Sequence, residues 1–145
     1  MADEVDETAQ RLSWNDTVIA EFRANGGRVG GNFEGSPLLL LHSTGARTGE
    51  ERVSPMMYLA DGDRYIVFAS NAGRDHHPAW YHNLVATADA SIEVDEDTVA
   101  VRAQVADRAE RDRLYAIQAE RFPGFAEYEA GTDRVIPVVI LTPRR

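Results

Sequence analysis

Two stretches of the sequence carry residue types that suit binding of a charged ligand. The first is a loop rich in glycine and arginine, Thr44-Gly45-Ala46-Arg47-Thr48-Gly49, which Arg52 follows. Glycine lets the backbone approach a ligand closely, and successive N–H groups in such a turn can surround an anion. Arginine adds permanently charged donors that suit phosphate or carboxylate. A hairpin loop with solvated arginines would look the same, because the loop is neither a Walker loop nor a dinucleotide fingerprint.

The second stretch is a polar and aromatic block, His77-Pro78-Ala79-Trp80-Tyr81-His82-Asn83-Leu84. Pro78 suits the first turn of a helix, which would place Trp80 and Leu84 on one face. Two strand-like runs separate this block from the loop. In this order, the loop, the strands and the block predict a site for a long, flat, anionic cofactor.

Neither a metal site nor a hydrolase is predicted. His76, His77 and His82 lie near Asp75, but adjacent histidines point in different directions and no spaced ligand set of the structural zinc type is present. A Ser-His-Asp hydrolase of the common type would carry a Gly-x-Ser-x-Gly elbow, which the sequence lacks.

Composition narrows the class of protein. The chain has 145 residues, which fits one domain with its own core. It has no cysteine and no lysine, which excludes a disulfide framework, a thiolate nucleophile and a Schiff-base lysine. The net charge of −9 argues against nucleic acid as a partner. With no long apolar run and no signal-peptide pattern, we expect a cytoplasmic protein.

The first part of the chain predicts a helix and a glycine-rich loop. Residues 1–12 are acidic and lack periodicity, so we expect them to be loosely ordered. Ser13 or Asn15 can cap a helix that runs to about Asn25. Its short apolar face and acidic flank favour a soluble protein, although the helix could cover the substrate face or touch a membrane. Arg28 follows it as either an extra anion contact or a solvated side chain.

The middle and the end of the chain predict strands that arrive as hairpins. Runs over residues 37–42, 52–60 and 65–70 are apolar, and Asp61-Gly62-Asp63 is a strong turn signal between the last two. Residues 91–95 and 98–105 form another predicted hairpin. A helix capped by Asp107 and Glu110 follows, then a further helical turn over 125–128, and a last strand over 135–141 with Pro137 at an edge or bulge.

This count of about six strands with helices between them predicts one domain over residues 13–145, mainly antiparallel β with peripheral helices. The strands follow one another as hairpins and do not alternate with helices. This order disfavours a parallel Rossmann sheet and favours an antiparallel barrel.

The residues also resemble a known family, the deazaflavin (coenzyme F420)-dependent nitroreductases and F420H2-dependent quinone reductases. The resemblance covers about Asn15 to the C-terminus. It rests on the loop at 42–49, on the block at 77–84, and on three shorter motifs, Arg52-Val53-Ser54-Pro55, Ala69-Ser70-Asn71-Ala72-Gly73 and Thr132-Asp133-Arg134-Val135-Ile136-Pro137-Val138.

The resemblance implies a split β-barrel, similar to FMN-binding barrels, that binds reduced F420 and transfers its hydride to a quinone, an enone or a nitroaromatic acceptor. The implied contacts of the cofactor's phosphate and glutamyl tail are Gly45, Ala46, Arg47, Thr48 and Arg52. Those lining the deazaflavin end are Pro55, Ser70, Asn71, Trp80 and Asn83. An extended polyanion with a planar ring needs such a combination of donors and an apolar slot.

The chain departs from the family at several positions. A further basic residue common at Ala46 and a lysine common at Asn71 are missing, which leaves the tail to Arg47 and Arg52. Met57 and Phe125 stand where nitro-drug activators carry tyrosines. Quinone or enone reduction is therefore favoured over nitroreduction.

Tyr128 and Ser70 are the candidate catalytic hydroxyls, since a proton must reach the reduced acceptor. Tyr128 could instead be a core or lid residue, and Ser70 a hydroxyl that bonds backbone at a strand end. Trp80 could simply be core, and Asn83 could bond backbone rather than the ring. An FMN-dependent split-barrel oxidoreductase and a non-enzymatic F420 carrier or sensor remain alternatives, and monomer and homodimer are both open.

Overall fold

The computed structural model describes residues 14–30 and 36–144, so the acidic segment over 1–12 and the cap at Ser13 lie outside it. Within these residues the chain forms one antiparallel sheet of seven strands in the order β2-β1-β5-β6-β7-β4-β3. The strands are β1 (Leu38–Thr44), β2 (Glu51–Met57), β3 (Leu59–Asp61), β4 (Arg64–Phe68), β5 (Asp89–Val94), β6 (Asp97–Val105) and β7 (Val138–Pro143).

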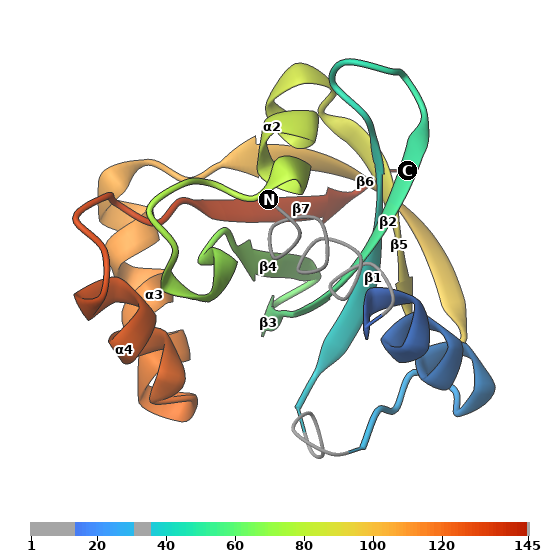
Figure 1. Ribbon diagram of the computed structural model, residues 1–145, viewed down its shortest axis with the longest axis horizontal. Helices are drawn as coiled ribbons and strands as arrows, with labels where there is room; N and C mark the ends of the chain where they lie inside the picture. Colours follow the sequence, from blue (N-terminus) through green and yellow to red (C-terminus); the bar gives the residue numbers. More distant parts are fainter. Residues whose placement is uncertain (1–13, 31–35, 145) are drawn as a thin grey trace, which may run out of the picture.

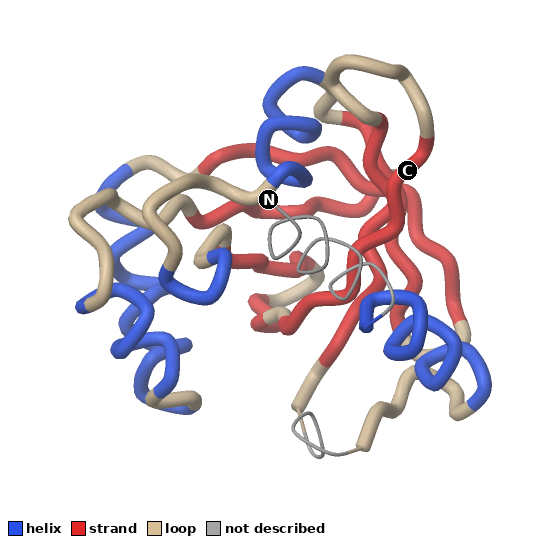
Figure 2. Tube along the Cα trace, in the orientation of Figure 1, coloured by secondary structure: helices blue, strands red, loops and turns tan. Residues whose placement is uncertain are grey.

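The sheet curls because its two edge strands are neighbours in sequence. Only Tyr58 separates β2 from β3, yet β2 pairs with β1 and β3 pairs with β4. The backbone N–H of Tyr58 donates to the carbonyl of Pro37 at this corner. The prediction of one strand over 52–60 was therefore wrong, since the chain changes partner at Tyr58. The result is the half-barrel of Figures 1 and 2, which confirms the antiparallel architecture with peripheral helices.

Strand β1 is buried on both faces of the sheet, which explains its uninterrupted run of leucines. Leu39 and Leu41 belong to a core cluster with residues of β4, β5, β6 and β7. Leu38 and Leu40 face the other way and pack against Phe22 of the N-terminal helix. Packing on both faces fixes the position of β1, and with it the position of Thr44, where the strand ends and the loop begins.

The helices surround the sheet. Residues 14–24 form the N-terminal helix; the others are α2 (Ala79–Ala86), α3 (Arg108–Arg121) and α4 (Gly124–Ala130), with a short 3₁₀ turn, η2 (Asn71–Gly73). Figure 1 shows α3 and α4 at one side of the sheet and the N-terminal helix, in blue, at the other. The predicted cap is confirmed, since Asp107 accepts a hydrogen bond of 2.9 Å from the N–H of Glu110.

The last strand begins later than predicted, at Val138 rather than Val135. Pro137 has no N–H to donate to a neighbouring strand. Its carbonyl accepts a hydrogen bond from the N–H of Ala69, just after β4. The residues before Pro137 consequently leave the sheet, and Arg134 among them reaches the site described next.

Candidate active site

The loop between β1 and β2 is tightly folded by its own hydrogen bonds. The N–H of Gly45 donates to Glu50 O at 2.7 Å, and the N–H of Gly49 donates to Gly45 O at 2.9 Å. A Cβ at position 45 would lie 2.8 Å from the hydroxyl of Thr48 and 3.2 Å from Glu50 O. A side chain at position 45 would therefore force its neighbours to shift, and the φ of +73° at Gly49 favours glycine there.

Helix α2 holds this loop in place through Asn83. The side-chain oxygen of Asn83 accepts from the N–H of Ala46 at 2.9 Å, and its amide nitrogen donates to Ser43 Oγ at 3.2 Å. Within the described residues, the N–H groups of Arg47 and Thr48 have no protein acceptor. Two backbone donors thus remain for a ligand, while the buried Asn83 is engaged within the protein.

Charges of both signs surround the loop. Arg47 and Arg52 are exposed, and Arg52 Nη2 lies 3.8 Å from Glu50. Arg23 of the N-terminal helix is paired with Glu93 at 2.7 Å. Among the described residues Arg47 has no carboxylate partner, which leaves its guanidinium available for an anion.

A turn with left-handed backbone forms a second part of the site. The φ angles of Asn71, Ala72 and Gly73 in η2 are 48°, 55° and 79°, and such values at non-glycine residues carry strain. The Asn71 side chain supports the turn, because Nδ2 donates to His76 O and Oδ1 accepts from Arg74, both at 3.1 Å. A Cβ on Gly73 would lie 3.2 Å from Cα of Tyr128, so α4 packs directly on the turn.

The loop and the turn line two joined hollows, which we call the groove. Its loop end, about 1020 Å³, is lined among others by Gly45, Ala46, Arg47, Thr48, Arg52, Trp80 and Asn83. Its Tyr128 end, about 1080 Å³, is lined by Pro55, Ser70, Asn71, Trp80 and Tyr128, beside Met56, Met57, Phe68 and Phe125. The residues that line both ends are Asn15, Ser54, Ala79, Trp80 and His82. All the predicted site residues therefore line one groove, although Asn83, expected beside the deazaflavin, lies at the loop end instead.

The groove suits a long ligand with one anionic and one apolar end. At the loop end, Arg47 and Thr48, whose N–H groups have no acceptor among the described residues, line the hollow together with Arg52. At the Tyr128 end, methionine and phenylalanine side chains accompany the hydroxyls of Ser70 and Tyr128. An extended polyanionic cofactor with a planar ring fits this arrangement.

His77 lines the Tyr128 end of the groove, and Arg134 supports that end from outside it, although sequence reasoning gave neither residue a role. Arg134 Nη2 donates to Ser70 O, its Nε donates to Arg74 O, and its Nη1 lies against His77 Nδ1, each at 2.8 Å. The guanidinium of Arg134 therefore contacts three residues within the segment 70–77, which contains η2. The signals in the sequence were the place of Arg134 in the motif before the last strand and that of His77 at the start of the polar and aromatic block.

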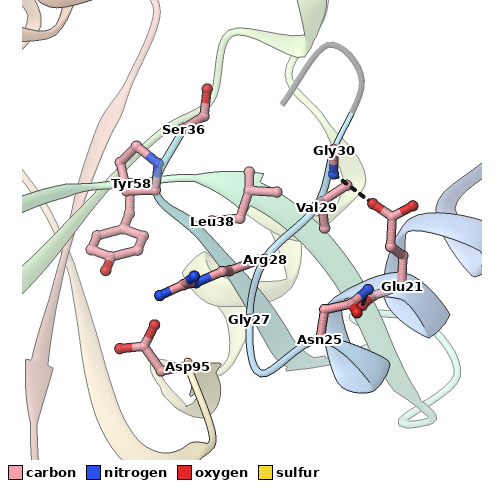
Figure 3. Close-up of a pocket in the computed structure, with 11 residues that line it drawn as sticks. Glu21, Asn25, Gly27, Arg28, Val29, Gly30, Ser36, Leu38, Tyr58 and Asp95 are labelled. Atoms are coloured by element: carbon pink, nitrogen blue, oxygen red, sulfur yellow. Dashed lines mark hydrogen bonds between the residues drawn. The ribbon is translucent and has the colours of Figure 1, made fainter. Parts of the chain in front are cut away.

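A separate hollow lies at the other end of β1 (Figure 3). It measures about 1090 Å³ and shares no lining residue with the groove. Arg28 lies there and points toward Tyr58 and Asp95. Arg28 is therefore not an additional anion contact of the Arg47 loop.

The described residues also bear on two other features, a metal site and a membrane-spanning helix. No group of three or more histidine, cysteine, aspartate or glutamate side chains within residues 14–30 and 36–144 is placed to hold a metal ion. No helix in the same ranges has the length and apolarity needed to cross a membrane.

Comparisons with known proteins point to one family. Residues 14–143 match the family described as F420H(2)-dependent quinone reductase. An F420H(2)-dependent quinone reductase of Mycobacterium tuberculosis is 40% identical over 139 residues, 93% of this chain and 91% of its own.

Solved structures agree in fold. The structure of an F420-H2 dependent reductase, FDR-A, is 33% identical, has a TM-score of 0.67, and covers 72% of this chain and 93% of its own. Another, described as a domain-swapped dimer, is 30% identical with a TM-score of 0.68 over 97% of this chain and 98% of its own. The half-barrel is thus a split β-barrel, and the chain belongs to the F420H(2)-dependent quinone reductase family.

Proposed function

We propose that this protein binds reduced coenzyme F420 and reduces a quinone or an enone with it. The observation that carries the proposal is the single groove, with free N–H donors and Arg47 at one end and an apolar pocket with two hydroxyls at the other. The reduced deazaflavin, when bound, supplies a hydride and gives up one proton overall, so that a quinone becomes a hydroquinone.

Each part of the groove has a proposed task. The loop from Gly45 to Thr48 and Arg52 hold the phosphate and the glutamyl tail through backbone N–H groups and guanidinium charge. Pro55, Ser70, Asn71 and Trp80 line the ring, and Asn83 acts by holding the loop through Ala46. The hydroxyls of Tyr128 and Ser70 bond the acceptor oxygen on which charge develops.

The acceptor follows from the side chains around Tyr128. Met57 and Phe125 line the same end of the groove as Tyr128. These apolar side chains can pack on the ring of an acceptor but give no hydrogen bond to a strongly polar nitro group. Quinones and enones are therefore the proposed acceptors, with nitroaromatics as slower substrates. The proposal keeps the cytoplasmic location expected from the sequence, which cell fractionation tests.

Titration of the purified protein with F420, with FMN and NADPH in parallel, tests the proposal. Reduced F420 and a simple quinone are then mixed with the protein without oxygen, and reoxidation of the deazaflavin is followed. We expect tight F420 binding and protein-dependent reoxidation. Binding without turnover across acceptors would favour a carrier or sensor, and binding of FMN but not F420 would indicate an FMN enzyme.

A further inference from the structure

The tautomer of His77 is determined by its contact with Arg134. Nη1 of Arg134 lies 2.8 Å from His77 Nδ1. A guanidinium has only donors and keeps its proton in proteins, so Nδ1 must accept. An imidazole that accepts at Nδ1 is neutral and carries its proton on Nε2.

The surroundings of His77 favour the same neutral form. Burial, then the charges of Arg134, His82 and His76, hold the pKa of His77 below its ordinary value. The rings of Tyr81 and His82 on α2 lie 4.8 and 5.9 Å from its ring. Asp75, the acidic neighbour, is directed to His76 at 3.1 Å.

The other ring nitrogen is available to a ligand. Within the described residues Nε2 of His77 has no hydrogen-bond partner. His77 lines the Tyr128 end of the groove together with Ser70 and Tyr128. A donor whose tautomer is fixed, on the wall of the groove beside two hydroxyls, has the properties of an oxyanion-hole group.

We propose that His77 donates its Nε2–H to the acceptor oxygen during hydride transfer, and that Arg134 is the positioning residue that sets this tautomer. The inference rests on the proposed function. As the hydride adds to the acceptor, an electron pair moves onto the oxygen, where the Nε2–H hydrogen bond stabilises it. His77 keeps its proton throughout, and the proton that completes the hydroquinone is the one that the reduced deazaflavin gives up to solvent. His77 thus acts as a neutral donor and not as a general acid.

Proton–nitrogen correlation spectra of the histidine rings test the tautomer without any turnover. The chain has four histidines, so His77→Gln assigns the signal. We expect a bare Nδ1 and a protonated Nε2 at neutral pH. Arg134→Met should raise the pH at which the His77 ring becomes protonated, whereas Arg102→Met, an exposed arginine on β6, should leave it unchanged. A protonated Nδ1 in the wild-type protein would overturn the inference.

Single-turnover reoxidation of reduced F420 by a quinone tests the donor role. His77→Leu should slow it roughly 10²-fold, the usual cost of one oxyanion donor, with F420 affinity within about two-fold of wild type. His77→Gln, which keeps an N–H donor, should recover part of the rate and leave the shape of the pH profile unchanged. Equal rates for wild type and His77→Leu would refute the donor role. A wild-type protein without turnover would instead overturn the proposed function and the donor role with it, and the spectra would still report the tautomer.

Discussion

The side-chain oxygen of Asn83 accepts a hydrogen bond of 2.9 Å from the backbone N–H of Ala46, which joins α2 to the loop after β1. Asn83 is buried, and its amide nitrogen also reaches Ser43. The loop between β1 and β2 is therefore oriented by a residue from the aromatic block rather than by its own sequence alone. The two motifs form one unit in space.

Removal of this amide should loosen the loop. Asn83→Ala leaves the N–H of Ala46 without its partner, so we expect a loss of about 1–3 kcal/mol in the free energy of unfolding and weaker F420 binding. Urea unfolding and F420 titration measure the two effects. Asn25→Ala is the matched control, because Asn25 is exposed and bonds only within its own helix end. Wild-type F420 affinity in Asn83→Ala would show that the loop keeps its shape unaided.

Arg47 should supply a charge-assisted contact to the cofactor tail. Arg47→Ala should weaken F420 binding by about 1.5–3 kcal/mol, or roughly 10- to 150-fold in Kd. The loss should shrink as salt is added, because the site is exposed. Titration at two ionic strengths measures this, with Arg102→Ala as the control for loss of one positive charge. Unchanged affinity in Arg47→Ala would remove Arg47 from the site.

Much of the fold could be predicted because its signals are local. The leucine run of β1, the turn at 61–63 and the Asp107 cap each depend on neighbouring residues, and the structure confirms all three. The break at Tyr58 could not be predicted, because the apolar pattern continues through it. Only the pairing of β2 with β1 and of β3 with β4 shows where the chain turns.

Sequence motifs predicted the site residues, but the contacts that each of them makes depend on the tertiary structure. Arg134 lies 64 positions from Ser70 in sequence, and no local pattern indicates that its guanidinium reaches the Ser70 carbonyl. The orientation of Asn83 toward the loop is likewise a result of how α2 packs. The sequence therefore predicted which residues lie along the groove, whereas the structure was needed to show which of them, such as Asn83, are bonded within the protein.

Gly73 should be required for the position of Tyr128. Its φ is +79°, and an added Cβ would lie 3.2 Å from Cα and 3.3 Å from O of Tyr128. Gly73→Ala should cost about 1–3 kcal/mol of stability and reduce turnover as α4 shifts. Gly124→Ala, at the start of the same helix and with nothing within 4 Å of the added Cβ, should have little effect. Thermal unfolding and quinone reduction compare the pair, and equal behaviour would contradict the packing argument.

The hydroxyl of Tyr128 should act on the acceptor rather than on the cofactor. Tyr128→Phe keeps the ring contact with Phe125, whose centroid is 5.4 Å away, and removes only the oxygen. We expect turnover to fall by roughly 10²-fold with F420 affinity nearly unchanged. Steady-state kinetics and titration separate the two, with Tyr65→Phe as the control within the sheet. Wild-type turnover would make Tyr128 a packing residue.

The ion pair that joins the N-terminal helix to β5 should stabilise the protein less at low pH. Arg23 donates to Glu93 at 2.7 Å, and His42 Nε2 lies 2.6 Å from the same carboxylate. Arg23 first, and His42 after it, hold the pKa of Glu93 below its ordinary value. Because the folded pKa is depressed, this stabilisation is complete above the unfolded value of about 4.3 and is lost as pH falls through the lower folded value.

Glu93→Gln tests this dependence. At neutral pH it should lower the free energy of unfolding by about 0.5–1.5 kcal/mol, a modest amount because Arg23 is half exposed. The difference from wild type should shrink as the pH falls below the ordinary range of glutamate, since the wild-type carboxylate then becomes neutral as well. Urea unfolding over a pH series measures it, with Glu120→Gln, exposed on α3, as the control. A difference that stays constant with pH would mean that Glu93 stabilises the helix by packing and not by charge.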